Sequence, residues 1–221
     1  MKGESNHYYS EKTRFLEQNI LNLGYGKYES NNEYGIPIIK KQDVENIELY
    51  SLIGFNYAMS CTDTKYKGVH FFLHDYQFER VWNYPQRYID TLKKFDFVLS
   101  PDFSPYADSP KAIQIFNVYR NRWMGRFWQE QGIKVIPTVT FNTDKESLKY
   151  CLDGIEEGSI IAVSTMGEGR WGEYRSLTDN WNYLLTTLKP SKVLLYGKRL
   201  DLNGNIIHMP YTGMNNSLRK D

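Results

Sequence analysis

The chain has 221 residues, of which 41 % are hydrophobic and 24 % charged, as is typical of a folded globular protein. Its 27 basic and 26 acidic residues give a formal net charge of +1, so no bulk positive field attracts nucleic acid, although a local patch stays open. Cys61 and Cys151 lie far apart, which gives no support to a disulfide framework, a zinc knuckle or an iron–sulfur site. Because no apolar run approaches the roughly 18 residues of a membrane helix and no signal peptide opens the sequence, we expect a cytoplasmic protein.

The first 46 residues differ from the rest and predict an N-terminal extension that packs on a single α/β domain spanning residues 47–221. Residues 11–22 have helical spacing, with Ser10 as a candidate N-cap and Gly24 just past the end. A loop then precedes the short extended stretch 36–39, which contains a proline and therefore favours a sheet edge.

From residue 47 onward, short apolar runs alternate with segments of helical length. Several runs are apolar at successive positions, as expected of parallel strands covered on both faces. The predicted strands are Ser51–Met59, Gly68–His74, Phe95–Leu99, Lys134–Thr140, Ser159–Ser164, Lys192–Tyr196 and Asn205–Met209. Prolines at the first helical position, a capping box and glycines after the last turn mark the ends of the helices between them. The predicted helices span residues 85–94, 110–131, 143–152 and 178–188.

The repeated strand–helix order predicts right-handed crossovers and a parallel sheet. An open doubly wound sheet and a barrel both satisfy this order. We favour an α/β fold of the (β/α) barrel-like or partial-barrel kind, because six or seven strands occur and polar residues gather where they end.

In both architectures, functional sites form at the carboxyl ends of the strands. Reading those ends off the sequence gives the polar residues Asn56, His74, Asp75, Asp102, Ser104, Asn142, Ser164 and Thr165, with His208 as a further candidate. We take Asp102, Ser104 and His74 as candidate catalytic residues, and Asn56 and Ser164 as candidate ligand-binding residues. The alternative for each is a loop residue that satisfies backbone groups.

The segment around Asp102 is the most informative. An apolar strand runs directly into this residue, and Pro101 and Pro105 stiffen the chain on either side. Rigid placement of a carboxylate at a strand end suits a general base or a cation site. The alternative is a turn in which Asp102 accepts backbone hydrogen bonds.

The helix predicted after this segment carries an arginine on its apolar face. At 100° per residue, that face contains Ala112, Ile113, Phe116, Tyr119, Trp123 and Phe127. Arg120 falls inside it, Asn117 lies beside it, and Arg122 lies toward the opposite edge. A buried guanidinium needs a carboxylate, phosphate or carbonyl partner. We therefore expect these three residues to bind an anion in a cavity shared with Asp102, unless Arg120 simply pairs with a core carboxylate.

Residues 167–172 read Gly-Glu-Gly-Arg-Trp-Gly directly after a predicted strand. The following helix starts too late for a dinucleotide fingerprint. A glycine loop that offers N–H groups to a phosphate, with Gly167, Gly169 and Arg170, stays open beside a mobile lid or a plain surface loop. His70 and His74 lie roughly 13 Å apart along a strand, which is too far for one metal ion unless the strand bends. We therefore predict no metal site, and the sequence leaves the cofactor unknown.

Several ordered motifs resemble the domain-of-unknown-function 4417 family over roughly residues 43–197. They are Phe97-Val98-Leu99-Ser100-Pro101-Asp102-Phe103-Ser104, Asn117-Val118-Tyr119-Arg120-Asn121-Arg122, Trp128-Gln129 with Gly132 and Val135-Ile136-Pro137-Thr138-Val139, Asp153-Gly154-Ile155, Ser164-Thr165 with Gly167, Leu188-Lys189-Pro190 and Tyr196-Gly197. The resemblance implies a protein of bacteriophages, prophages or plasmids acting in a bacterial cytoplasm. It implies a genomic setting and no reaction.

Two classes of function stay open on this sequence. One is an enzyme that acts on a phosphate-bearing nucleotide or nucleic acid, with Asp102 as base or metal ligand and Arg120 as anion holder. The other is a non-catalytic binder of a host protein or a small signal molecule, such as an anti-defence inhibitor. The aromatic content of 15 % favours this second class because tyrosine is common at binding surfaces.

Overall fold

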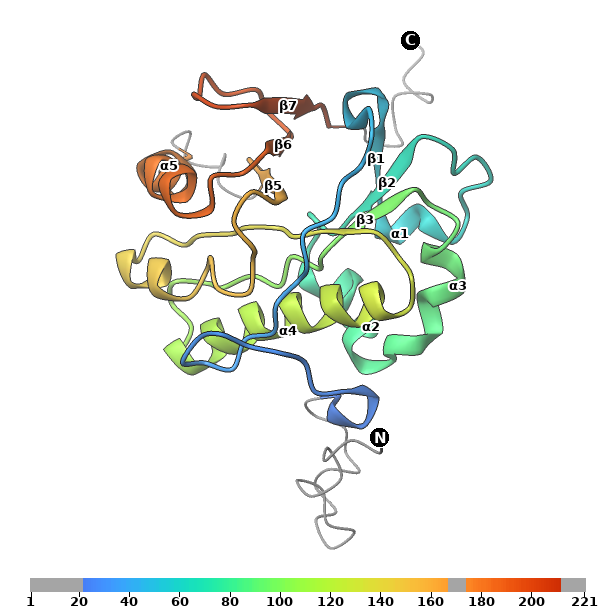
Figure 1. Cartoon of the computed structure of the whole chain (residues 1–221), viewed down its shortest axis with the longest axis horizontal. Helices are drawn as coiled ribbons and strands as arrows, with labels where there is room; N and C mark the ends of the chain where they lie inside the picture. The colour runs from blue at the N-terminus through green and yellow to red at the C-terminus, as the bar shows by residue number, and fades with distance from the viewer. Residues whose placement is uncertain (1–21, 167–173, 212–221) are drawn as a thin grey trace, which may run out of the picture.

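A computed structural model describes residues 22–166 and 174–211 (Figure 1). The strands in these ranges are β1 (Ser51–Gly54), β2 (Lys67–His70), β3 (Phe97–Leu99), β4 (Val135–Ile136), β5 (Ile160–Ser164), β6 (Lys192–Tyr196) and β7 (Ile206–Met209). The α-helices are α1 (Phe55–Ala58), α2 (Glu79–Asn83), α3 (Ile89–Leu92), α4 (Lys111–Glu130) and α5 (Arg175–Leu188). Helix and strand therefore mix along the chain, which confirms an α/β fold. The predicted helix at residues 11–22 lies almost wholly outside the described residues.

All strand pairings in the two sheets are parallel, and the strands follow chain order. One sheet has the order β1-β2-β3-β4 and the other β5-β6-β7. Two backbone hydrogen bonds join the sheets just beyond β4: Val139 N–H donates to Ala162 O at 2.8 Å, and Ala162 N–H donates to Pro137 O at 2.9 Å. Within the described residues β7 does not pair with β1, so a closed barrel is not formed.

The combined sheet curves, so that strands far apart in its order face each other across a shared core. The ring of His70, at the end of β2, lies 4.3 Å from the ring of Tyr196, at the end of β6. The core between them takes side chains from both sheets. They include Leu52, Phe72, Phe97, Leu99, Ile136, Ile160, Ala162, Leu194, Tyr196 and Met209. Burial lowers the pKa of His70 to about 3, so this imidazole is a neutral part of the core.

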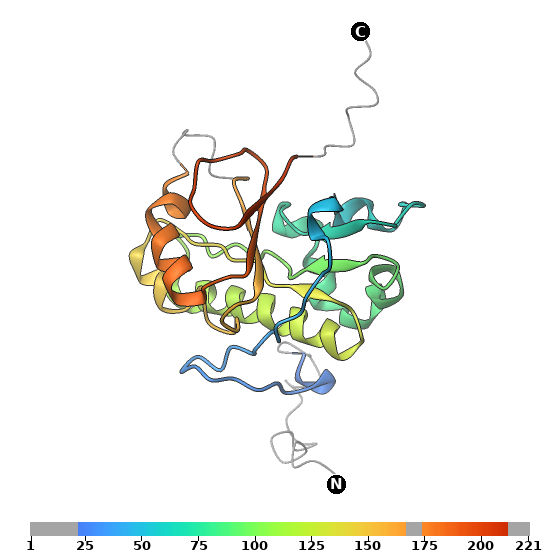
Figure 2. The same cartoon turned by 45° about the horizontal axis from the view of Figure 1, so that its top comes forward.

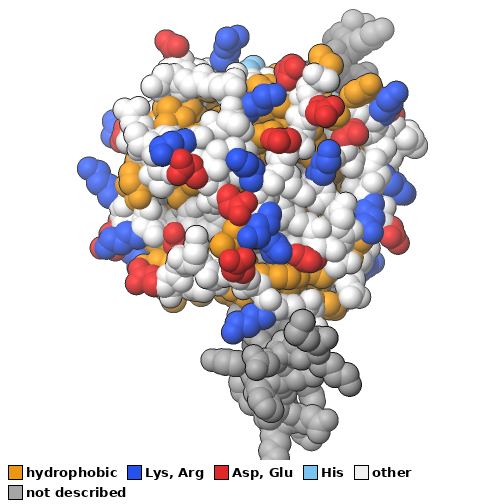
Figure 3. All heavy atoms as spheres, viewed as in Figure 1, with side chains coloured by type: hydrophobic (Ala, Val, Ile, Leu, Met, Phe, Trp, Pro, Cys, Tyr) orange, Lys and Arg blue, Asp and Glu red, His pale blue; other side chains and the backbone are white. Residues whose placement is uncertain are grey.

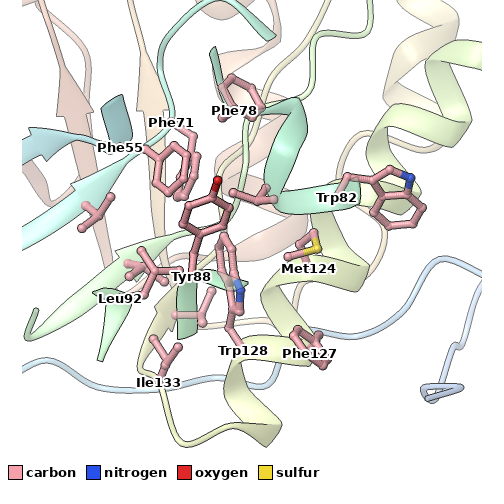
Figure 4. Packing of buried hydrophobic residues seen from close by; sticks show 14 of the residues in the cluster. Phe55, Phe71, Phe78, Trp82, Tyr88, Leu92, Met124, Phe127, Trp128 and Ile133 are labelled. Atoms are coloured by element: carbon pink, nitrogen blue, oxygen red, sulfur yellow. The ribbon is translucent and has the colours of Figure 1, made fainter. Parts of the chain in front are cut away.

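A second core lies between the first sheet and helices α2, α3 and α4. Figure 4 shows its aromatic side chains converging from α1, α2, α4 and the segments between β2 and α3. The Phe55 ring stacks on Phe71 at 4.9 Å and meets Tyr88 edge-on at 5.2 Å. Burial of each such ring stabilises the fold by about 1.5–3 kcal/mol. A third cluster beneath α5 includes Trp181, Leu184 and Leu188.

Helix α4 crosses beneath both sheets and is buried on nearly all sides (Figures 1 and 2). The N-terminal segment 22–46 covers part of its outer surface. A Cβ on Gly125 would lie 2.4 Å from Ile39 Cδ1, so glycine permits this close approach. Lys40 N–H donates to Gln129 Oε1 at 2.9 Å, and Gln129 Nε2 donates back to Lys40 O at 2.7 Å. The predicted domain boundary at residue 46 stays a prediction.

Several elements differ from those predicted. The strand predicted for residues 68–74 ends at His70, and the strand predicted for residues 134–140 spans only Val135–Ile136. The helix predicted for residues 85–94 divides into a 3-10 helix, Pro85–Tyr88, and α3. The apolar run 51–59 divides, because the chain turns into α1 after Gly54 and buries Phe55 and Ala58 on one side of that turn. The helix predicted for residues 143–152 is a 3-10 helix, Lys145–Lys149, capped by the Asp144 side chain. Helix α2 was missed because its five residues are too few for a periodic pattern.

Candidate functional site

A cavity of about 530 Å³ opens beyond the carboxyl ends of β3, β4 and β5. Its walls come from the segments that follow these strands and from the first turn of α5. The lining residues are Asp102, Ser104, Pro105, Tyr106, Ala107, Val139, Thr140, Phe141, Asn142, Thr143, Ser164, Met166, Tyr174, Arg175, Ser176 and Leu177. The cavity therefore lies where parallel α/β folds build their sites, as the sequence predicts.

Asp102 lies in this lining, three residues beyond β3. The Thr140 hydroxyl donates a hydrogen bond to its carboxylate. Burial raises the pKa of the Asp102 carboxyl to about 6, and the nearby Asp75 charge adds to that rise. The hydrogen bond from Thr140 and the charge of Arg122 act against it. A carboxyl whose pKa lies this close to neutrality can both release and take up a proton under physiological conditions.

Ser104 lies in the same lining and is held from two sides. Its hydroxyl donates to Asp75 Oδ1 at 2.9 Å, and its backbone N–H donates to Asp75 Oδ2 at 3.1 Å. Asn117 Nδ2 donates to the carbonyl of Ser104 at 2.7 Å. Asn117 is thus buried behind the segment that contains Ser104. It holds the backbone of that segment in place and does not line the cavity.

Arg120 is buried as predicted, but it does not line the cavity with Asp102. Its guanidinium pairs with Glu79 at 2.6 Å and donates to Asn117 Oδ1 at 2.7 Å. It also lies over the Phe103 ring, 3.9 Å from the centroid. The predicted common cavity is wrong for this residue, because α4 directs Arg120 toward α2, where Glu79 supplies the carboxylate partner.

Arg122 is fully enclosed and bonded to protein acceptors. It donates to the carbonyls of Asp153, Thr138 and Cys151 at 2.9, 2.8 and 2.7 Å, and to the Asn121 side chain at 2.7 Å. Burial lowers its pKa to about 10, which leaves it charged at neutral pH. Its predicted anion-binding role is not supported by this placement, because its head group already joins α4 to the segment after β4 and to the loop before β5.

The remaining predicted site residues have separate positions. Ser164 lines the cavity and accepts a hydrogen bond from the Met166 N–H at 2.9 Å. His74 is exposed and stacks on Tyr76, outside the cavity lining. Asn56 is also exposed, at the start of α1. The predicted glycine-loop residues Gly167, Gly169 and Arg170 lie outside the described residues.

Thr140 and Arg175 are among the lining residues that the sequence analysis did not single out. A signal for Thr140 was present, since Thr138, Thr140 and Asn142 place polar side chains at every second position beyond β4. Arg175 was missed because α5 begins there, earlier than the predicted start at residue 178.

In the described parts of the chain, every helix falls short of the length and apolar character that a bilayer crossing requires. No solved structure matches the chain. The "Gene 1 protein" of Mycobacterium phage L5 is 41 % identical over 150 residues, which cover 67 % of this chain and 63 % of that protein. The "Gene 1 protein" of Mycobacterium phage D29 is 46 % identical over 100 residues, which cover 45 % of this chain and 37 % of that protein. The matches thus span less than two thirds of either relative.

The family model described as "Domain of unknown function (DUF4417)" matches residues 28–211. This range extends beyond the motifs at residues 43–197 on both sides, and it includes every described strand and helix from residue 28 onward. The resemblance found in the sequence is confirmed: the chain belongs to the DUF4417 family and is similar to proteins of mycobacteriophages.

Proposed function

We propose that this chain is an enzyme that acts on a phosphate-bearing nucleotide, with Asp102 as its general acid–base group. The observation that carries the proposal is the position of this carboxyl: it lies in the lining of the strand-end cavity, and burial brings its pKa to about 6. General acid–base catalysis is most efficient when the pKa of the catalytic group lies near the working pH.

The composition of the cavity supports a nucleotide. Its 530 Å³ lies within the range of small-molecule sites. Tyr106, Phe141 and Tyr174 offer ring surfaces for a base, and Arg175 supplies a cation for a phosphate. Arg175 thus takes the anion-holding role that the sequence assigned to Arg120.

Surface charge favours a small nucleotide over a nucleic acid strand. Lys, Arg, Asp and Glu side chains intermingle over the face shown in Figure 3, where no large single-sign patch forms. Nucleic acid binding depends on many cationic contacts to phosphates, and the net charge is only +1. A nucleotide substrate and the phage relatives together support action in the cytoplasm of a bacterial host.

The same proposal extends to the architecture. The strands of the described residues are parallel, follow chain order and curve until His70 contacts Tyr196, which supports a partial (β/α) barrel that is open between β7 and β1. In barrels of this kind the active site lies at the carboxyl ends of the strands. The cavity has that position.

The test combines calorimetric titration with nucleoside mono-, di- and triphosphates and chromatographic detection of products. Asp102→Asn should keep nucleotide affinity within about threefold and lower turnover by about a hundredfold or more. Asp108→Asn is the matched control, because it lies in the same segment but outside the cavity lining, and it should match the wild type. Unchanged turnover in folded Asp102→Asn, or no nucleotide binding by the wild type, would contradict the proposal.

A second candidate is a non-catalytic binder of a host protein or a small signal molecule, such as an anti-defence inhibitor. Exposed tyrosines support it: Tyr76 is 79 % exposed, Tyr84 59 % and Tyr106 54 %. Native mass spectrometry of protein purified from the bacterial host separates the two candidates. A retained ligand that is never converted favours the binder, whereas conversion of the ligand favours the enzyme.

A further inference from the structure

The Ser104 hydroxyl is oriented as a nucleophile would be. Its proton is directed to Asp75 Oδ1, 2.9 Å away, which leaves the oxygen lone pairs unused by that bond. The separation lies within the roughly 2.6–3.2 Å that joins an activated hydroxyl to its base. Ser104 lines the cavity together with Asp102, two residues earlier in the chain.

Both members of this pair are fixed by their surroundings. Asp75 holds the backbone N–H of Ser104 as well as its hydroxyl, and Asn117 holds the Ser104 carbonyl. Arg120 donates a hydrogen bond to the Asn117 side chain, and its positive charge interacts with Asp75. Burial lowers the pKa of Arg120, while the charges of Glu79 and Asp75 raise it. The pair therefore has the base and the orienting groups that nucleophilic catalysis requires.

We propose that Ser104 is the nucleophile and Asp75 its base, in the reaction for which Asp102 is the acid–base group. The inference rests on the proposed function and adds a covalent intermediate to it. The substrate class is a phosphate ester of a nucleotide. Hydrolases commonly combine a nucleophile, a base and a third residue that orients the base. Ser104 and Asp75 would supply the first two of these roles.

In the first step, the Ser104 oxygen forms a bond to phosphorus and its proton passes to Asp75. The bond from phosphorus to the leaving oxygen breaks, and the neutral Asp102 carboxyl protonates that oxygen. In the second step, water attacks phosphorus and gives its proton to the Asp102 carboxylate. The bond between phosphorus and Ser104 then breaks, and Asp75 returns the proton to the serine. The net reaction consumes one water and releases an alcohol and a phosphate.

An alkyl fluorophosphonate tests this assignment without knowledge of the natural substrate. The serine oxygen bonds to phosphorus and fluoride leaves, so the adduct adds a defined mass. Peptide mapping of the full-length wild type should place the adduct on Ser104. Ser60 is an internal control: it is exposed, but its hydroxyl donates to the Tyr57 carbonyl at 3.1 Å, which is not a base. Ser60 should stay unlabelled.

The variants show whether Ser104 is labelled because Asp75 activates its hydroxyl or only because the serine is accessible. Ser104→Ala should abolish the adduct, and Asp75→Asn should slow labelling by about tenfold or more, because an amide does not take up the serine proton. Ser60→Ala should be labelled at the wild-type rate. Circular dichroism checks the fold of each variant, and the site of labelling in the wild type requires no variant at all.

The outcomes distinguish the two proposals. Folded wild type without an adduct on Ser104, or Asp75→Asn labelled at the wild-type rate, overturns the nucleophile. An adduct on Ser104 in a protein that binds no nucleotide keeps the nucleophile and overturns the nucleotide substrate. Nucleotide turnover that depends on Asp102 but persists in Ser104→Ala keeps the proposed function and replaces the serine by direct attack of water.

Discussion

The Thr140 hydroxyl donates a hydrogen bond to the Asp102 carboxylate, and this contact joins the segments that follow β4 and β3 within one cavity wall. The two residues are 38 positions apart in the chain. Their contact depends on the parallel pairing of β3 with β4. The relationship gives the acidic group a fixed position while burial keeps its pKa high.

Removing the Asp102 charge should stabilise the fold at alkaline pH. The folded pKa is raised from 3.8 to about 6, so the folded state retains a proton that the unfolded chain has lost. Stability therefore falls as pH rises from about 4 to about 6 and then stays level. Asp102→Asn should be more stable than the wild type by about 1–2 kcal/mol at pH 8, and no more stable at pH 4. Urea unfolding at both values measures this, and an equal difference at both would contradict it.

Arg122 should be among the residues whose loss destabilises the fold most. Arg122→Ala leaves the buried carbonyls of Thr138, Cys151 and Asp153 without their donor, at a cost of about 3–5 kcal/mol. Arg126→Ala is the matched control on the same helix, since its ion-pair partner Glu130 is half exposed, and it should cost about 1 kcal/mol or less. Denaturant unfolding compares the two, and similar losses would argue against the assigned role of Arg122.

Arg120 should matter for stability and leave nucleotide affinity alone. Arg120→Ala removes the pair with Glu79 and the stacking on Phe103, at a cost of about 2 kcal/mol. Glu79→Gln keeps a hydrogen-bond acceptor for Arg120 and should cost less. Calorimetric titration of the folded variants should give affinities within about twofold of the wild type. A tenfold loss of affinity in Arg120→Ala would restore this residue as an anion holder.

The Phe97 ring, on β3, packs against Gly68, on β2, in the space that a side chain at position 68 would fill. A Cβ on Gly68 would lie 2.3 Å from the ring carbon Cε2. Gly68→Ala should therefore cost about 1–3 kcal/mol. In a double-mutant cycle, Phe97→Leu should recover about 1 kcal/mol of that loss by making room for the methyl group. Strictly additive losses would show that the ring does not cover Gly68.

The positions of the strands were predictable because their signal is local, whereas β1, β2 and β4 are shorter than predicted. β6 has the predicted bounds, and β5 differs from the prediction by one residue, since continuous apolar runs mark strands covered on both faces. Helix α4 was also found, but its surroundings were not. A helical wheel assumes one buried face, whereas segment 22–46 and the loops around α4 also bury Gln114, Asn121 and Arg122.

Individual residues of the candidate site were predictable, but the contacts between them were not. Asp102, Ser104 and Ser164 do share one cavity, as their strand-end positions suggest. The partner of Arg120 was not predictable, because Glu79 lies in a short helix 41 residues away and no periodic pattern connects the two. Pairing across such a distance is decided by tertiary packing, which a single sequence does not display.

The proposed function places the chemistry of the protein in the cavity beyond β3, β4 and β5. The most direct measurement is a crystal structure of Ser104→Ala soaked with the nucleotide that raises the melting temperature most. We expect ligand density in this cavity, with phosphate oxygens within hydrogen-bond distance of Arg175 and an ester oxygen beside the Asp102 carboxyl. Ligand density bound elsewhere, with the cavity holding only water, would contradict it.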